Sequence, residues 1–236
     1  MEKLARALNL LGVNYQEDTL DKYKKYMDLV LSWNKKVNLT SITDKNEFVT
    51  KHFIDSIFVC GFSQMHEINK VIDVGTGAGF PGIPLAIVYP EKEFLLIDST
   101  NKRIKIIYEI SLEIGLKNVT FLHGRAEDIA HNKKYREQFD LCVSRAVAKL
   151  AVLSEYCLPF VKVGGWFAAY KSQGIEKELA ESQNAYKLLG GHLEKNNCIS
   201  IDGFGLDHRI LMIKKVKQTP AKYPRKAGTP TKDPLK

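Results

Sequence analysis

The sequence lacks the usual marks of metal-binding, disulfide-bonded and membrane-spanning chains. Its four cysteines are widely separated in 236 residues, with no Cys-x-x-Cys pair, so we expect buried, reduced thiols and no bound metal. His52 has no histidine partner four residues on and is interpreted as a packing residue. Apolar runs fall far short of the ~20 residues of a membrane helix, and the N-terminus lacks a signal-peptide core. We expect a cytoplasmic, globular protein.

Outside the C-terminal segment, basic and acidic side chains nearly cancel, so the net positive charge is small. The net charge is +8, yet residues 214–236 hold eight basic residues, one acid and four of the eight prolines. The other 213 residues carry 27 basic and 26 acidic side chains. A basic, proline-rich segment is expected to be extended or disordered when free. It is either an arm that contacts phosphates or a solvated tail that aids solubility.

The central feature of the sequence is a short apolar strand followed by a glycine-rich turn. Residues 71–74 are almost entirely apolar, which is typical of a strand buried on both faces. Gly75, Gly77 and Gly79 follow at a spacing of two, and Pro81 is expected in the first turn of the next helix. Such a turn presents amide N–H groups to a ligand, although a purely structural turn fits the glycines equally well.

The third glycine of the dinucleotide fingerprint is absent, which argues against a dinucleotide as the ligand. Phe80 occupies that position, so the pattern is Asp-x-Gly-x-Gly-x-Gly. This spacing resembles motif I of class I S-adenosylmethionine-dependent methyltransferases. Asp98 ends the next strand, 23 residues after Gly75, where a carboxylate can accept hydrogen bonds from ribose hydroxyls. Its alternative role is at the N-terminal cap of the following helix, with Ser99 or Thr100.

The hydrophobic period alternates between strand and helix over most of the chain. It predicts a doubly wound α/β fold with a mostly parallel seven-stranded sheet. The last two strands have no helix between them, which favours an antiparallel edge hairpin. Three helical segments precede the first strand, the third opened by a capping pair of Asp44 and Glu47. We divide the chain into a helical extension (1–68), a core domain (69–216) and the basic tail (217–236). The predicted strands are 71–74, 93–97, 119–123, 139–144, 165–171, 191–201 and 208–216.

The residues that end strand four lack the motifs of two other kinds of methyltransferase. Strand four ends in Ser144-Arg145-Ala146-Val147, without the Asn/Asp-Pro-Pro-Tyr/Phe of amino-methyltransferases or the Pro-Cys of cytosine-C5 enzymes. Arg145 offers a fork of donors that suits a carboxylate, a phosphate or the N7 and O6 edge of guanine. Pairing of Arg145 with a nearby acid is the structural alternative. After strand three, Glu127 or Asp128 is expected to face the adenine, and spacing leaves both open.

Five motifs of the sequence belong together: residues 33–40, 51–56, 73–82, 144–146 and 223–230. Together they resemble the bacterial small-subunit ribosomal RNA methyltransferase G family, formerly glucose-inhibited division protein B. The resemblance covers essentially the whole chain. It implies transfer of a methyl group from S-adenosylmethionine to N7 of one guanosine in the 530 loop of 16S rRNA, in the 30S subunit or an assembly intermediate. The cofactor contacts implied by the resemblance, with Asp98 at the ribose, are Gly75, Gly77, Phe80, Asp98, Ala126, Glu127 and Arg145.

Guanine N7 carries a lone pair and no proton, so we expect no general base, with Arg145 as the group that positions the guanine. The protein is expected to be a monomer. Truncation after Val216 is expected to weaken RNA binding while binding of S-adenosylmethionine survives. Two alternatives stay open: a class I enzyme acting on another nucleic acid or a protein, and a non-catalytic RNA-binding relative. The residues expected to contact RNA phosphates are Lys102, Arg103, Lys171, Arg225 and Lys226.

Overall fold

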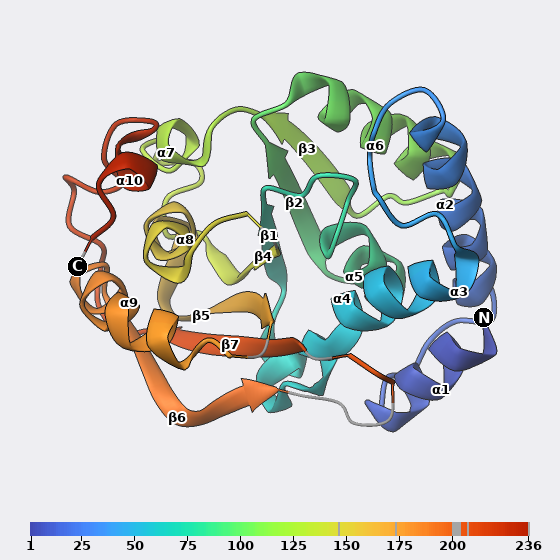
Figure 1. Cartoon of the computed structure of the whole chain (residues 1–236), viewed down its shortest axis with the longest axis horizontal. Helices are drawn as coiled ribbons and strands as arrows, with labels where there is room; N and C mark the ends of the chain where they lie inside the picture. The colour runs from blue at the N-terminus through green and yellow to red at the C-terminus, as the bar shows by residue number, and fades with distance from the viewer. Residues whose placement is uncertain (146, 173, 200–203, 207, 236) are drawn as a thin grey trace.

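A seven-stranded sheet runs through the middle of the computed structural model, in the order β3-β2-β1-β4-β5-β7-β6 (Figure 1). The first five strands pair in parallel, whereas β7 runs antiparallel to both β5 and β6. The predicted mostly parallel sheet with an antiparallel edge hairpin is therefore confirmed. The strands are β1 (Lys70–Val74), β2 (Glu93–Asp98), β3 (Val119–His123), β4 (Phe139–Arg145), β5 (Val161–Ser172), β6 (Gly191–Ile199) and β7 (His208–Lys215).

The structure describes residues 1–145, 147–172, 174–199, 204–206 and 208–235, with the backbone alone for 194–199. Ala146 of the predicted motif, the end of the predicted strand at 200–201, the thiol of Cys198 and Lys236 of the basic tail lie outside the described residues. The other three cysteines, Cys60, Cys142 and Cys157, are buried free thiols, as predicted.

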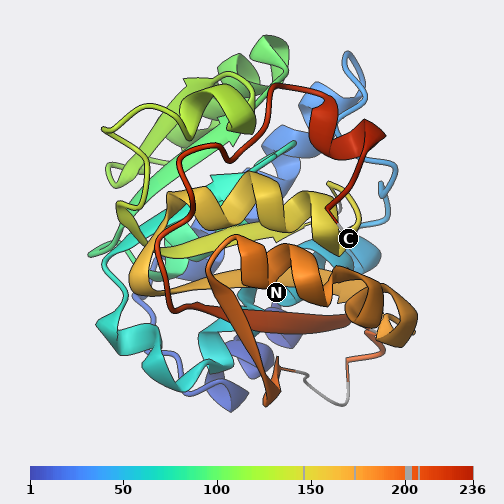
Figure 2. The same ribbon diagram turned by 90° about the vertical axis from the view of Figure 1, so that its left-hand side faces the viewer.

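The sheet is covered on both faces because successive residues of its strands point to opposite sides. In β1, Val71 joins one apolar cluster and Ile72 the other, and neither side chain is exposed. Figure 2 shows the helices on the two sides of the sheet. The first cluster packs under α1 (Glu2–Leu10), α2 (Thr19–Asn34), α5 (Gly82–Val88) and α6 (Asn101–Glu113). The second packs under α8 (Leu150–Cys157), η4 (Leu158–Phe160) and α9 (Glu176–Leu188).

The sheet has a topological switch point between β1 and β4. From β1 the chain adds β2 and β3 on one side, and then crosses to add β4 and β5 on the other. In open α/β sheets ligands bind outside the carboxyl ends of the strands at this point. The glycine-rich turn follows β1 and Arg145 ends β4, so the switch point brings the two predicted motifs to the same edge of the sheet.

The helical segment after residue 44 begins where the sequence predicts. The Asp44 carboxylate accepts hydrogen bonds from the backbone N–H groups of Asn46 and Glu47, which confirms Asp44 as the cap. Beyond α3 (Lys45–Phe48), the helix widens into a π-helix, η1 (Val49–Ile54), before α4 (Asp55–Ile57). Two 3₁₀ segments follow, η2 (Phe58–Gly61) and η3 (Ser63–Glu67). A π-helical turn is rare and often marks a functional site, and this one carries His52.

The C-terminal tail, expected to be extended or disordered, packs on the core and has no regular secondary structure among its described residues apart from one short helix. Residues 217–235, here called the C-terminal strap, run back across the helices of the second apolar cluster and end in α10 (Thr229–Lys232) (Figure 2). Arg136 donates from Nη2 to the carbonyl of Thr219 at 2.8 Å and from Nη1 to that of Tyr223 at 2.9 Å. The segment's composition predicts its charge and its lack of regular structure. It cannot predict hydrogen bonds from residues such as Arg136, more than 80 positions earlier in the chain.

Candidate active site

The glycine-rich turn is held in place from two sides. The N–H groups of Gly75 and Thr76 both donate to the carbonyl of Ile97 at the end of β2, at 2.9 and 3.0 Å. On the other side, Tyr26 of α2 donates its hydroxyl to the carbonyl of Ala78 at 2.7 Å. The helical extension therefore supports the turn directly. Pro81 lies at the cap position that precedes α5 rather than inside its first turn, a small correction to the predicted helix start.

Each glycine of the turn has a positive φ: 75° at Gly75, 60° at Gly77 and 100° at Gly79. A side chain at Gly79 would meet the Tyr26 hydroxyl at 2.5 Å, and one at Gly75 would meet Val147 at the same distance. The positive φ favours glycine at all three positions, and neighbouring side chains leave no room for a Cβ at Gly79 and little at Gly75. Gly75 also borders two cavities.

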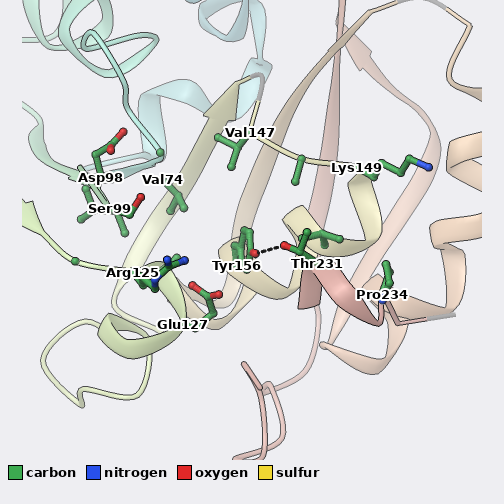
Figure 3. A pocket seen from close by; sticks show the side chains of 16 residues that line it. Val74, Asp98, Ser99, Arg125, Glu127, Val147, Lys149, Tyr156, Thr231 and Pro234 are labelled. Carbon is green, nitrogen blue, oxygen red and sulfur yellow. Dashed lines mark hydrogen bonds between the residues drawn. The ribbon is translucent and has the colours of Figure 1, made fainter. Parts of the chain in front are cut away.

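Two adjoining cavities lie at the carboxyl ends of β1, β2 and β4. The tail-side cavity, of about 550 Å³, lies between the turn, α7 (Ala126–Ile129), α8 and the strap (Figure 3). The loop-side cavity, of about 470 Å³, lies between the turn, η1 and Arg145. Both are lined by Gly75, Asp98, Ser99 and Val147. A ligand that occupied both cavities would pass over the face of Gly75.

Asp98 lies between the two cavities and is 5% exposed. One carboxylate oxygen accepts from the N–H of Gly77 at 2.9 Å and the other from the N–H of Thr100 at 2.8 Å. Arg103 approaches the same carboxylate at 3.9 Å. Asp98 thus fixes the glycine-rich turn and the start of α6, while it also borders both cavities.

The structure distinguishes the two acids after β3. Glu127 is 4% exposed and lines the tail-side cavity beside Ala126, whereas Asp128 is exposed. The Glu127 carboxylate also accepts a hydrogen bond from the N–H of Gly228 at 3.0 Å, so it connects the cavity wall to the strap. Of the two predicted candidates, only Glu127 borders the cavity.

Arg145 is held in a network at the loop-side cavity. Its guanidinium donates to the carboxylate of Asp55 at 2.7 Å, to the carbonyl of Lys51 at 3.0 Å and to Nδ1 of His52 at 3.1 Å. It also lies 5.1 Å from the centre of the Phe80 ring, on which His52 stacks at 4.3 Å. The structural alternative for Arg145, an ion pair with a nearby acid, is therefore present, and the arginine lines the cavity as well.

Charge and burial set the protonation of this network. Burial lowers the pKa of His52 to about 3, with the nearby charge of Arg145 acting in the same direction, so the ring is neutral. Its Nδ1 accepts from Arg145, so Nε2 carries the proton and donates to Thr40 at 2.7 Å. Burial alone would raise the pKa of Asp55, but the hydrogen bond from His208 and the charge of Arg145 outweigh it and hold that pKa below its ordinary value.

Beneath the turn, Asp73 is fully buried, and burial raises the pKa of its carboxyl to about 7. One oxygen accepts from the N–H of Gly82 at 2.9 Å. A hydrogen bond from the hydroxyl of Thr76 to the same carboxyl acts in the opposite direction to burial and lowers its pKa. Asp73 borders neither cavity, whereas Thr76 lines the loop-side one.

The five predicted phosphate-contacting residues lie in different environments. Lys102 is exposed in the first turn of α6, and Arg103 lines the loop-side cavity. Lys226 is exposed on the strap. Lys171 is nearly buried and donates to Glu178 and to the carbonyl of Ala148. Arg225 forms an ion pair with a fully buried acid, so Lys171 and Arg225, 11% and 22% exposed on their side chains, each have a carboxylate partner within the protein.

Several site residues carried no usable signal in the sequence. Asp55 lies within a quoted motif, yet its partners Arg145 and His208 are 90 and 153 residues away. Thr231 and Pro234 line the tail-side cavity from a segment that composition alone describes as disordered. Val147 is the exception, because the Ser144-Arg145-Ala146-Val147 run at the end of strand four already indicates this part of the site.

The strand order, the glycine-rich turn after β1 and the acid at the end of β2 define a class I methyltransferase fold. A solved structure from Klebsiella pneumoniae, described as "a putative O-methyltransferase", aligns with a TM-score of 0.53 at 13% identity, over 81% of this chain and 90% of that chain. At this identity the likeness supports the fold alone.

The chain belongs to the rRNA small subunit methyltransferase G family, whose model matches residues 19–202. A protein from Clostridium tetani named ribosomal RNA small subunit methyltransferase G is 48% identical over 233 residues, which cover 99% of this chain and 98% of that relative. A protein of the same name from Exiguobacterium is 45% identical over 229 residues, covering 97% of this chain and 96% of the relative. The resemblance drawn from the motifs is confirmed.

The described residues include neither a membrane-spanning helix nor a metal-binding cluster. None of their helices is both long and apolar enough to cross a membrane. Nor do these residues include a cluster of three or more His, Cys, Asp or Glu side chains that could hold a metal ion.

Proposed function

We propose that the protein transfers a methyl group from S-adenosylmethionine to N7 of a guanosine in the 530 loop of 16S rRNA. Membership of the small-subunit rRNA methyltransferase family supports the class of substrate. The observation that carries the proposal is the pair of adjoining cavities that share Gly75 and Asp98. One cavity is suited to the adenosine of the cofactor, and the other, beside Arg145, to its methionine end and the target base.

The residues around the cavities fit this cofactor. Asp98 presents a carboxylate where the ribose hydroxyls would lie, and Glu127 and Ala126 line the cavity expected to hold the adenine. Gly75 borders both cavities beside Val147, and Thr76 lines the loop-side cavity. Gly77, Phe80 and Arg145 complete the loop-side cavity. These are the residues that we propose hold S-adenosylmethionine.

When bound, the cofactor supplies a methyl group already activated by a sulfonium. In such a transfer the lone pair of guanine N7 would form the new N–C bond as the C–S bond broke, and the electron pair of the C–S bond would stay on sulfur. The purine would gain the positive charge, so the protein would have no proton to move. The protein must therefore align the guanine and exclude water, and alignment of this kind contributes ~7 to 11 kcal/mol. Arg145, held rigidly by Asp55 and His52, is placed to present fixed donors to the guanine edge.

Contacts with the RNA backbone are proposed for the exposed basic residues nearest this edge. Lys102 and Arg103 lie at the first turn of α6, next to Asp98, and Lys226 is exposed on the strap. Charged side chains of this kind position phosphates and make binding dependent on salt. We propose a monomer acting on the 30S subunit or an assembly intermediate.

The absence of a proton transfer predicts a flat pH profile. At saturating substrates, kcat should vary less than about threefold between pH 6 and 8.5, because His52 remains neutral and Asp55 remains ionised over this range. Asp73 is the buried group near the turn whose pKa, about 7, lies within the range, so Asp73→Asn serves as the control. The prediction is wrong if kcat falls tenfold per pH unit below a neutral pKa in both the wild type and Asp73→Asn.

The proposed function is tested by incubating the protein with S-adenosylmethionine labelled in its methyl group and four acceptors: 30S subunits, naked 16S rRNA, DNA and bulk protein. We expect label in the small-subunit RNA, and mass spectrometry of the digested RNA should place it on N7 of one guanosine in the 530 loop. Label in DNA or protein would support a different class I methyltransferase. Binding of 30S subunits without any labelled product would support a non-catalytic RNA-binding relative.

A further inference from the structure

The C-terminal strap forms part of the tail-side cavity. Thr231 and Pro234 line that cavity together with Asp98 at the end of β2 and Glu127 of α7 (Figure 3). On α8, Tyr156 shares a hydrogen bond with the hydroxyl of Thr231 at 2.9 Å. The wall of the cavity away from the glycine-rich turn therefore consists of strap residues and the α8 side chain that holds them.

An ion pair holds this wall against the core. The Arg225 guanidinium donates from Nη2 to one oxygen of Glu155 at 2.8 Å and from Nε to the other at 3.0 Å. The backbone N–H of Arg225 donates to the same carboxylate at 2.8 Å. Glu155 is fully buried and Arg225 is 22% exposed on its side chain. A bidentate arginine with a third bond from its own backbone fixes both the position and the direction of the strap.

The strap also reaches the side chain expected to face the adenine. The N–H of Gly228 donates to Glu127 at 3.0 Å, and Gly228 has a φ of 83°, at the residue before α10. Glu127 and Thr231 are therefore connected through four residues of strap, and both border the same cavity. A displacement of the strap would remove one wall of the tail-side cavity and would at the same time break the hydrogen bond between Gly228 and Glu127.

We propose that the strap is a part of the cofactor-binding site, with Thr231 and Pro234 as its wall and Arg225 as the residue that positions it. The inference rests on the proposed binding of S-adenosylmethionine in the tail-side cavity. It adds a role in cofactor binding to the RNA contacts proposed for the segment, and it implies that cofactor binding does not survive loss of the strap. The strap governs affinity for S-adenosylmethionine and its product, S-adenosylhomocysteine.

The test measures binding of S-adenosylhomocysteine to the full chain by calorimetry. Thr231→Tyr adds bulk to the cavity from an exposed position, so we expect Kd to rise at least tenfold with an unchanged melting temperature. The double variant Glu155→Gln, Arg225→Gln removes the ion pair without leaving a buried charge unpaired, and should raise Kd similarly. Arg225→Lys, which restores charge but not the fork, should lie between the wild type and the double variant. Lys217→Gln, an exposed lysine of the same strap, is the matched control and should bind as the wild type does.

Steady-state kinetics separates this role from a merely structural one. In Thr231→Tyr the KM for S-adenosylmethionine should rise tenfold, while kcat, the Kd for 30S subunits and its salt dependence stay within twofold of the wild type. Wild-type affinity in folded Thr231→Tyr and in the double variant would overturn the inference. If Gly75→Ala still abolished cofactor binding in that case, the proposed function would stand without it. Failure of the wild type to bind S-adenosylhomocysteine would overturn both.

Discussion

Replacement of Gly75 by alanine should weaken binding of S-adenosylmethionine at least 100-fold, about 2.8 kcal/mol, while the protein stays folded. A Cβ at this position would come within 2.5 Å of Val147, which is 39% exposed, so the valine can move. The methyl group and the displaced valine would then occupy the region shared by both cavities. Calorimetry with the cofactor, together with the melting temperature, checks this outcome.

Gly12→Ala is the matched control for that substitution. Gly12 has a φ of 66°, close to the 75° of Gly75, and a Cβ there would meet nothing within 4 Å. Both variants share the backbone strain of a left-handed alanine, about 1 kcal/mol, but Gly12 lies far from the turn in the sequence and lines neither cavity. Undiminished binding in folded Gly75→Ala would show that the cofactor does not lie over this residue.

Asp55→Asn should lower the free energy of unfolding by about 3 kcal/mol at pH 7, because it removes the charge opposite Arg145 inside the protein. Asp55 is 1% exposed and accepts 2.7 Å hydrogen bonds from Arg145 and His208. Arg145 would keep its hydrogen bonds to Lys51 and His52 but lose its ion pair with Asp55, so its orientation at the cavity would be held less firmly. We expect kcat/KM to fall about 100-fold, the usual effect of a displacement of about 1 Å.

The sign of the pH dependence follows from the lowered pKa of Asp55. A carboxyl whose pKa is lower in the folded state stabilises the fold above its unfolded pKa, about 3.9, and loses that effect as the pH falls through the folded value. The stability difference between the wild type and Asp55→Asn should therefore be constant near neutrality and shrink below about pH 4. Denaturant unfolding from pH 2 to 8 measures it.

Asp28→Asn provides the comparison with an exposed ion pair. Asp28 and Lys45 are 2.8 Å apart but 47% and 65% exposed on their side chains, so loss of the pair should change the stability by less than about 0.5 kcal/mol. An equal loss of stability in Asp28→Asn and Asp55→Asn would mean that burial of the Arg145 network contributes nothing.

The strands and the glycine-rich turn could be predicted because their signals are local. Apolar runs of four to seven residues followed by glycine or a helical period identify the first five strands, and the positions of Gly75 and Asp98 relative to those strands follow directly. The sheet order needs more than this. The last two strands were correctly expected to form an edge hairpin, but nothing local indicates that β7 lies inside and β6 at the edge.

The rest of the site depends on partners that are far apart in the sequence. Glu127 and Asp128 are equivalent by spacing, and only burial distinguishes them. For Arg225, composition predicted a free basic side chain, because the buried Glu155 that binds it lies 70 residues earlier. In both cases the deciding quantity is the location of a side chain in the folded protein.

The support of the turn by Tyr26, 52 residues before Ala78, has a consequence for folding. Together with the contact between Gly228 and Glu127, 101 residues apart, it makes the site dependent on segments from both ends of the described chain. Contacts of such high sequence separation form late, after the cost of loop closure has been met. The capacity to bind a ligand should therefore appear in the last cooperative step of refolding, and the site and the whole domain should be lost together on unfolding.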